Sequence, residues 1–131
     1  MTARHTTPQT TSYATETLTV YGDIVGELAL ELEQALEQAL GRDTHFIILD
    51  LSAMTFIDEI GISAIVAAMR TARMNQGDVI LLWPVASGAR KLLQLYVIDR
   101  VFLMCETLWE AHSAIEQHTS KLQQMRQRNA V

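Results

Sequence analysis

The heptapeptide His45-Phe-Ile-Ile-Leu-Asp-Leu51 decides the fold. Its apolar residues run on without the polar alternation of a half-exposed strand. A short, unbroken apolar run of this kind is typical of a central parallel strand that is covered on both faces. Two further apolar runs, Val79-Ile-Leu-Leu-Trp83 and Val101-Phe-Leu-Met-Cys105, predict two more strands of the same kind.

Helical patterns separate these strands. Residues 27–40 carry leucines at helical spacing and are followed by Gly41, so they predict an amphipathic helix. A second helix is predicted at about 60–76, and a short third one after Ser87, which can cap it. The apolar stripes of the three helices are Leu28, Leu32, Leu36 and Leu40, then Ile62, Ile65, Val66 and Met69, then Leu92, Leu93 and Leu95.

Alternation of strands and helices predicts an α/β domain with a mostly parallel sheet covered by helices. Before the first helix, Glu16–Tyr21 alternates polar and apolar residues, which predicts a half-exposed N-terminal edge strand that ends at Gly22. The expected buried core includes Ile47, Leu49, Ile65, Val66, Ile80, Leu82 and Phe102.

A chain of 131 residues is the size of one domain. Residues 1–14 are Thr-rich and without periodicity, so we expect a flexible tail there, followed by the domain at 15–119. Thr107 and Glu110 form a capping box that opens a long last helix, with 120–131 as a helical extension. The extension either frays or forms a homodimer or partner contact. The seam for such a contact is Leu108, Ile115, Leu122 and Met125.

The charge distribution argues against nucleic-acid binding. The chain has 10 basic and 15 acidic residues, and residues 16–60 hold ten of the acids but only one base, Arg42. An acidic front half is a poor match for DNA or anionic lipid. No apolar run approaches the length of a membrane span, and the N-terminus lacks the apolar core of a secretory signal. We therefore expect a cytoplasmic protein without direct membrane insertion.

Residues able to carry chemistry are few. Cys105 is the single cysteine and lies in an apolar run, so a buried, inert thiol is expected. Among the histidines, His112 and His118 are close in sequence, but a spacing of six puts them on different helix faces. Asp50 and Asp58 could in principle pair as catalytic carboxylates, but no third group points to a reaction. We expect no enzyme activity, no metal and no cofactor.

The most informative segment runs from Leu49 to Ser63, where a buried strand ends, a loop follows and Asp58 takes the N-cap position of the next helix. Asp50-Leu-Ser52, Phe56-Ile-Asp58 and Gly61-Ile62 resemble the signature of the STAS domain, the fold of bacterial anti-sigma factor antagonists. Weaker matches lie in the expected order from Thr17 to His118. They are Gly22-Asp-Ile24, Gly77-Asp-Val-Ile80, Pro84-Val85, Arg90-Lys-Leu-Leu93, Ile98-Asp-Arg-Val-Phe102 and Thr107-Leu-Trp-Glu-Ala111.

The resemblance implies a binding module whose partner is an anti-sigma factor that is also a serine kinase. In that family the kinase phosphorylates the Ser or Thr just before the signature glycine, and the phosphorylated form dissociates. Here the residue before Gly61 is Ile60, which has no hydroxyl, and Glu59 replaces the usual serine before it. Thr55 and Ser63 are nearby hydroxyls and weak candidates for phosphorylation.

We therefore expect a non-enzymatic STAS protein that docks to a protein partner without the usual phosphoacceptor. The expected docking residues are Phe56, Ile57, Asp58, Glu59, Ile60, Gly61 and Ser63. Two other functions stay open at this point: an accessory STAS subunit of a transporter or ATPase, and a small-ligand or nucleotide sensor at the helix N-terminus. Glu59 disfavours an anionic ligand, because it faces the positive end of the helix itself.

Overall fold

The computed structural model describes residues 14–129, without the side chains of residues 122, 123 and 125–129. The predicted tail falls almost wholly outside this range. The elements in chain order are β1 (Ala14–Ile24), α1 (Glu27–Leu40), β2 (Thr44–Ile57), α2 (Glu59–Met74), β3 (Asp78–Leu82), α3 (Ser87–Leu95), α4 (Ile98–Val101), β4 (Leu103–Cys105) and α5 (Leu108–Asn129).

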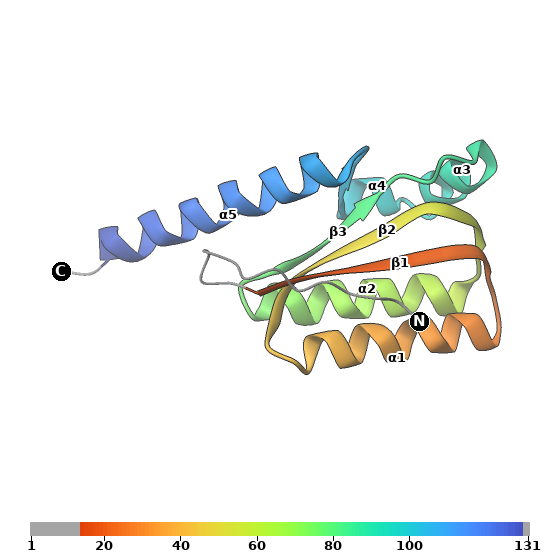
Figure 1. Ribbon diagram of the computed structural model, residues 1–131, viewed down its shortest axis with the longest axis horizontal. Coiled ribbons are helices and arrows are strands. Elements are labelled where there is room, and N and C mark those ends of the chain that lie inside the picture. Colours follow the sequence, from red (N-terminus) through yellow and green to blue (C-terminus); the bar gives the residue numbers. More distant parts are fainter. Residues whose placement is uncertain (1–13, 130–131) are drawn as a thin grey trace.

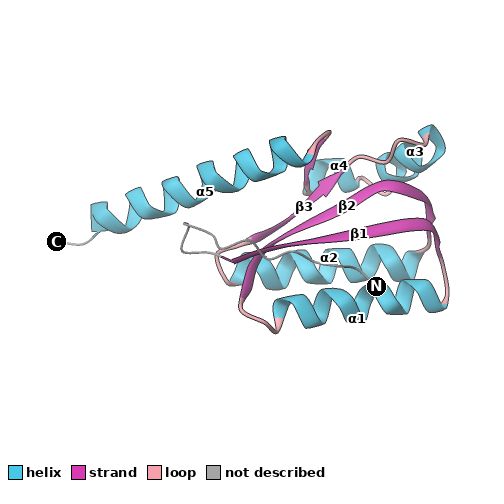
Figure 2. Cartoon of the chain, viewed as in Figure 1, coloured by secondary structure: helices cyan, strands magenta, loops and turns pink. Residues whose placement is uncertain are grey.

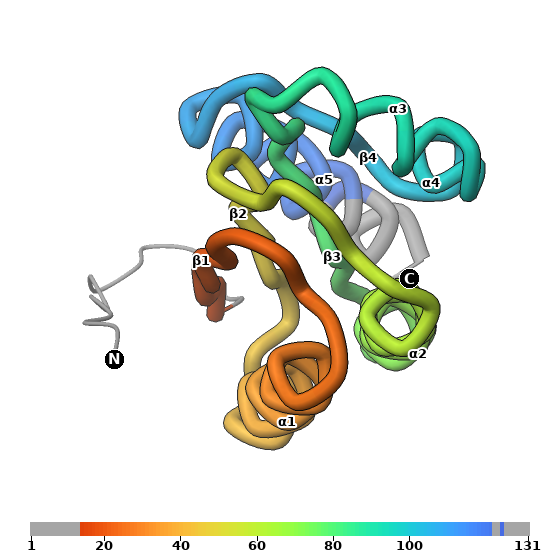
Figure 3. Tube along the Cα trace, turned by 90° about the vertical axis from the view of Figure 1, so that its right-hand side faces the viewer, coloured from red at the N-terminus to blue at the C-terminus, as the bar shows by residue number. Residues whose placement is uncertain are grey.

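The four strands form one sheet in the order β1-β2-β3-β4, and each neighbouring pair is parallel. Helices α1 and α2 lie on one face of the sheet, and α5 lies on the other (Figures 1 and 3). Short connections at the ends of strands and helices complete the layers (Figure 2). This arrangement confirms the predicted α/β fold and the edge position of the first strand.

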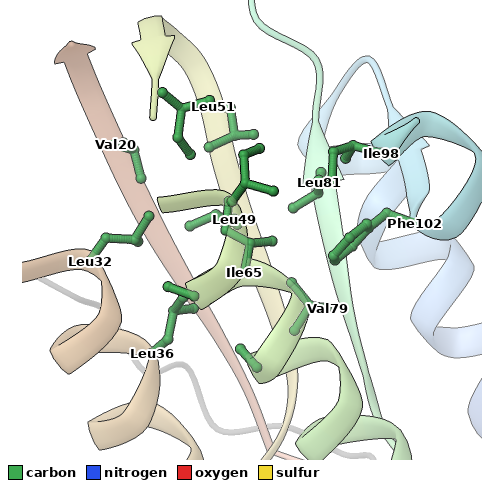
Figure 4. Close-up of a cluster of buried hydrophobic side chains, with 14 of the residues drawn as sticks. Val20, Leu32, Leu36, Leu49, Leu51, Ile65, Val79, Leu81, Ile98 and Phe102 are labelled. Atoms are coloured by element: carbon green, nitrogen blue, oxygen red, sulfur yellow. The ribbon is translucent and has the colours of Figure 1, made fainter. Parts of the chain in front are cut away.

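The central strand β2 buries side chains on both faces, as its unbroken apolar run predicted. Ile47 and Leu49 point to the main core, which α1, α2, α3 and α4 complete (Figure 4). Phe46 and Ile48 belong to a smaller cluster with residues of α5 on the opposite face. This division follows from the period of two along a strand. Of the expected core residues, only Val66 is not fully buried.

The first two strands are longer than the sequence patterns predicted. Gly22 was expected to end β1, but the strand continues to Ile24 through an irregularity between Gly22 and Asp23, where Gly22 has a φ of 69°. The second strand was expected to end at Leu51, and it instead continues to Ile57. The two strands pair along their whole length, from Ala14 opposite Thr44 to Ile24 opposite Ile57, so each supplies the hydrogen-bond partners that lengthen the other.

The segment after β3 differs more from the prediction. The expected strand 101–105 is reduced to Leu103–Cys105, because Ile98–Val101 forms the short helix α4. Val97, in the left-handed conformation with φ 54°, turns the chain into that helix. Ser87 was expected to cap α3, but it is the first residue of the helix, and no side chain caps α3.

Two predicted apolar stripes are only partly buried. In α1, Leu32 and Leu36 enter the core while Leu28 is exposed, and in α3 Leu95 is exposed. The last helix begins as predicted: the Thr107 hydroxyl accepts a hydrogen bond from the Glu110 N–H at 3.1 Å. The Glu110 carboxylate in turn accepts from the Glu106 N–H, one residue earlier than an ideal capping box.

Helix α5 covers the sheet with its first three turns and then continues past it (Figure 1). Among the α5 side chains that the structure describes, Ala111, Ile115 and Thr119 are buried. Ile115 is 4% exposed in the cluster with Phe46 and Ile48, so it was wrongly placed in a seam open to partners. The side chains of Leu122 and Met125, the other half of that seam, lie outside the described residues, and Leu108 is exposed.

Candidate functional site

The end of β1 and the end of β2 bring two loops together at the carboxyl edge of the sheet. Ile24 pairs with Ile57, and the Asp58 N–H donates to the Ile24 carbonyl oxygen at 3.0 Å. Helix α1 begins at Glu27, shortly after β1 ends, and helix α2 begins at Glu59, shortly after β2 ends. Two helix N-termini therefore lie side by side at the place where sites collect in open α/β sheets.

Asp58 joins these two helix starts through its carboxylate. One oxygen accepts from the Gly61 N–H at 3.0 Å, in the first turn of α2, and the other accepts from the Gly26 N–H at 3.1 Å, just before α1. The Gly61 hydrogen bond is the main cause that holds the pKa of Asp58 below its usual range; desolvation opposes it, and the Gly26 bond adds to the lowering. The predicted N-cap role of Asp58 is confirmed.

Gly61 allows α2 to pack directly on the end of β2. A Cβ built on Gly61 would lie 2.6 Å from Cγ1 and 2.8 Å from Cδ1 of Ile57, which is closer than carbon atoms pack. Ile57 is completely buried. The glycine thus lets the buried isoleucine and the first helical turn occupy neighbouring positions, and this fixes the path of the loop between them.

Four exposed apolar side chains lie on the segments that meet at this junction. We call Val25, Leu28, Phe56 and Ile60 the loop patch; they are 41%, 46%, 44% and 46% exposed, respectively. The same segments carry three exposed acids: Asp23, Glu27 and Glu59. Exposed apolar side chains accompanied by polar ones are typical of protein-binding surfaces.

The structure separates the predicted docking residues into two groups. Phe56, Glu59, Ile60 and Ser63 are exposed and so accessible to a partner. Ile57 and Gly61, also expected to dock, are buried in this structure, where they hold the loop in place. Asp58 is half-buried and engaged with backbone N–H groups.

Sequence reasoning missed Val25 and Leu28 as members of this surface. The available signal was the position of Val25 directly after the Gly22-Asp-Ile24 segment, which the resemblance had already singled out. Leu28 was hidden by its place in a regular leucine stripe. The first turn of α1, which carries Leu28, lies next to Asp58 only because β1 pairs with β2.

The other candidate residues serve the fold. Asp50 accepts from the Ser52 N–H at 2.9 Å, whereas the Asp58 oxygens are held by Gly26 and Gly61, so the two carboxylates are not joined as a catalytic pair. Thr55, one of the two candidate phosphoacceptors, donates its hydroxyl proton to Asp23 at 2.5 Å.

Cys105 is buried as expected, and its burial, with a smaller contribution from Glu110, raises the pKa of the thiol. Of the two helix histidines, His112 is exposed, and the His118 ring packs edge-on against Phe46 with centroids 5.3 Å apart. Within the described residues, no three His, Cys, Asp or Glu side chains come together as metal ligands. No helix in that part of the chain is both long and apolar enough to span a membrane.

Comparison with known proteins agrees with this architecture. The STAS domain family model matches residues 9–111. The anti-sigma factor antagonist SpoIIAA in its unphosphorylated form is 20% identical, with a TM-score of 0.69 over 88% of this chain and 97% of that one. An anti-sigma factor antagonist from Mycobacterium paratuberculosis is 22% identical, with a TM-score of 0.69 over 87% and 93% of the two chains.

A third similar structure comes from another class of protein. A sulfate transporter family protein from Wolinella succinogenes is 14% identical, with a TM-score of 0.67 over 81% of this chain and 88% of that one. At these identities the solved structures establish the fold, while the family model covers most of the sequence. The fold, the signature segment around Asp58 and the family match together establish that this chain belongs to the STAS domain family.

Proposed function

We propose that this protein is a non-enzymatic regulator that docks to a protein partner through the loop patch, in the manner of an anti-sigma factor antagonist. The partner class is an anti-sigma factor that is also a serine kinase. The proposal is supported by the solved structures of antagonists that share the fold. It places the protein in the cytoplasm, where sigma factors act.

The observation that carries the proposal is the exposure of Ile60 on a fixed loop. Ile60 is 46% exposed. It lies two residues after Asp58, which caps α2, and directly before Gly61, which packs on Ile57. An isoleucine that the fold does not bury is available to a partner, and desolvated apolar side chains at the centre of an interface carry much of the binding free energy. We propose Phe56, Val25 and Leu28 as the other apolar contacts.

Ile60 also occupies the position that the family resemblance gives to the phosphoacceptor. Structures of SpoIIAA exist in unphosphorylated and phosphorylated forms, so that relative can carry a phosphate. A kinase cannot phosphorylate an isoleucine side chain. We therefore propose that docking here is not switched at residue 60, and that Thr55 and Ser63 are weaker candidates, Thr55 because its hydroxyl is already bonded to Asp23.

Glu59 admits two opposite interpretations. It could imitate the charge of a phosphorylated residue and keep the partner away, or it could turn to solvent beside an apolar contact. We favour the second, because one carboxylate repels less than a phosphate, which carries a charge of about −1.5 to −2. Glu59 is exposed at the start of α2, where its charge is also favoured by the helix dipole.

The test is a binding measurement with the anti-sigma serine kinases of the source organism as probes. Ile60→Asp should weaken binding more than tenfold, or by about 1.4 kcal/mol, because it buries an unpaired charge in the interface. Glu59→Gln should change binding little. The matched control is Leu95→Asp, which places the same charge on an apolar residue that is 80% exposed on α3.

Equal binding by the parent and Ile60→Asp would show that the loop patch is not the docking surface. Equal weakening by Leu95→Asp would show that the effect is one of net charge. Circular dichroism of each variant checks that the fold is retained, which is expected because both positions are exposed.

A second candidate function is that of an accessory STAS subunit on a transporter or ATPase. The observation that favours it is the shared fold of a sulfate transporter family protein. The same loop patch would then face a membrane-bound subunit. Binding by a transporter encoded beside this gene, with none by the kinases, would select this function.

The end of α5 is proposed as a separate association element. Residues 120–129 extend the helix past Thr119, the last buried residue among the α5 side chains that the structure describes. Truncation after Thr119 should lower any dimer fraction in sedimentation experiments, and an unchanged dimer would place the interface elsewhere.

A further inference from the structure

A groove runs between the free edge of β1 and helix α1, and reaches the loop junction at Ile24 and Leu28. It has a volume of about 610 Å³. Within residues 14–129, β1 pairs with β2 alone, so its other edge borders this groove. Its apolar lining comes from Leu18, Val20, Ile24, Leu28, Leu32 and Ala35.

The charged residues that line the groove are Glu16, Glu31 and Arg42, so the lining has one net negative charge. Glu31 is exposed on α1 at the groove, while Glu16 is neutralised by Arg42, with 2.5 Å between the charged atoms. Helix α1 carries four glutamates and no lysine or arginine along its whole length. An apolar lining beside uncompensated negative charge suits an occupant that is both apolar and basic.

The C-terminal part of α5 has this composition. The sequence after Glu116 contains Lys121, Arg126 and Arg128 and no acidic residue, and it places Leu122 and Met125 three residues apart. The helical segment from Ser120 to Asn129 is ten residues long, or about 15 Å.

This segment is poorly placed to neutralise α1 of its own chain. Helix α1 lies on one face of the sheet and α5 on the other (Figures 1 and 3). Beyond the sheet, α5 continues away from the domain in a straight line (Figure 1). The acidic groove and the basic helix end of one molecule are thus separated by the sheet, and they can meet only between molecules.

We propose that residues 120–129 of one copy dock as a helix in the β1–α1 groove of a second copy. Helix-in-groove binding places apolar anchors in an apolar groove, with charges meeting at its border. Each copy offers one helix end and one groove, so two copies can close a symmetric dimer with two identical contacts. The proposal uses the α5 extension described above and shares only Leu28 with the loop patch.

The expected dimer is weak and salt-dependent. A ten-residue helix buries little surface, and interfaces below about 1,000 Å² are usually transient. Charges at a groove border are screened within about 8 Å at physiological ionic strength. Self-association should therefore appear at low salt and decrease as salt is raised.

The test is sedimentation of the full chain with a charge swap. Glu31→Lys should weaken self-association at least tenfold, because a basic groove then repels the basic helix end. Arg126→Glu with Arg128→Glu should do the same, because an acidic helix end meets an acidic groove. An equimolar mixture of the two variants should restore the dimer, since both contacts in the mixed dimer join opposite charges.

Two matched variants complete the test. Glu37→Lys changes the net charge as Glu31→Lys does, at an exposed α1 glutamate outside the groove lining, and it should weaken self-association much less than Glu31→Lys. Ile60→Asp should self-associate like the parent, so that a failure of partner docking is distinguished from a failure of this proposal.

Three results would overturn the proposal. The first is a parent that stays monomeric at low salt up to about 0.1 mM. The second is a mixture of the swapped variants that fails to restore the dimer. The third is a full chain whose self-association is unaffected by Glu31→Lys, while a chain lacking residues 1–13 self-associates more strongly and is weakened by Glu31→Lys. That outcome would assign the groove of the full chain to its own N-terminal segment.

Discussion

The carboxylate of Asp58 accepts a hydrogen bond from the backbone N–H of Gly26, which lies 32 residues earlier in the chain, at 3.1 Å. A residue that caps its own helix thus also holds the start of a different helix. The bond adds to the last rung of the β1–β2 ladder and to the Thr55–Asp23 hydrogen bond, which join the same two strand ends. This carboxylate helps to hold the loops that carry Val25 and Ile60, so its protonation state bears on stability and, through these loops, on the proposed docking.

Acid should loosen this junction. Because the folded protein lowers the pKa of Asp58, the ionised carboxylate stabilises the fold at pH values above the ordinary value, about 4. This contribution is lost as the pH falls below that value towards the lowered pKa. In urea unfolding between about pH 6 and pH 3, Asp58→Asn should lose less stability on acidification than the parent does.

At neutral pH the same variant should be less stable than the parent, because an amide can accept from Gly61 but presents its NH₂ group to the Gly26 N–H. Glu37→Gln removes one exposed carboxylate from α1 and should follow the pH dependence of the parent. An Asp58→Asn curve parallel to that of the parent would show that the junction does not depend on the charge.

The close contact between Gly61 and Ile57 gives a second prediction. Gly61→Ala should destabilise the domain by about 1–3 kcal/mol, the usual cost of overpacking, because the added Cβ would overlap Cγ1 of Ile57. Ile57→Ala removes both atoms that clash. In that background, the further change Gly61→Ala should cost less, and chemical denaturation of the four proteins measures the coupling. Purely additive losses would contradict the contact.

The thiol of Cys105 should react slowly in the native protein. It is buried in the cluster with Phe46 and Ile115, and burial raises its pKa, so both access and thiolate content are low. In the native protein at about pH 8, a chromogenic disulfide reagent should label the thiol only as fast as the structure opens locally. In urea, where the protein is unfolded, labelling should be as fast as that of a free cysteine. Rapid labelling of the native protein would show that α5 leaves the sheet readily.

Much of the fold could be predicted from hydrophobic periodicity, because a strand buried on both faces and a helix buried on one face each leave a distinct pattern. Residues 45–51 of β2 and residues 27–40 of α1 are examples. The errors arose where long-range pairing overrides local pattern. Residues 52–57 contain polar Ser52 and Thr55 and resemble a loop, yet they form a strand because β1 continues beside them.

The candidate site was predictable to the same limited extent. The N-cap role of Asp58 follows from its position before an apolar helical pattern, and the structure confirms it. Its second bond, to Gly26, had no local signal, because it depends on the register between β1 and β2. For the same reason, Val25 and Leu28 could not be placed beside Ile60 until the strands were paired.

Restoring a hydroxyl at residue 60 should restore phosphorylation. The loop around Ile60 is shaped by backbone bonds to Asp58 and by the Gly61 contact, neither of which uses the Ile60 side chain. Ile60→Ser should therefore keep the loop and add the one group that phosphoryl transfer requires.

The measurement uses radiolabelled ATP and the kinase that binds the parent protein most tightly. The parent should bind this kinase without accepting phosphate, and Ile60→Ser should accept it. Mass spectrometry of the loop peptide would then locate the phosphate on Ser at position 60. Ile60→Ala is the matched control: it removes the same apolar contact without adding a hydroxyl, and so should bind less tightly and stay unlabelled. Label on the parent at Thr55 or Ser63 would contradict a permanently unswitched protein. Absence of label on Ile60→Ser, despite tight binding, would show that the kinase does not address this loop, and with it the docking geometry proposed for Ile60 would fail.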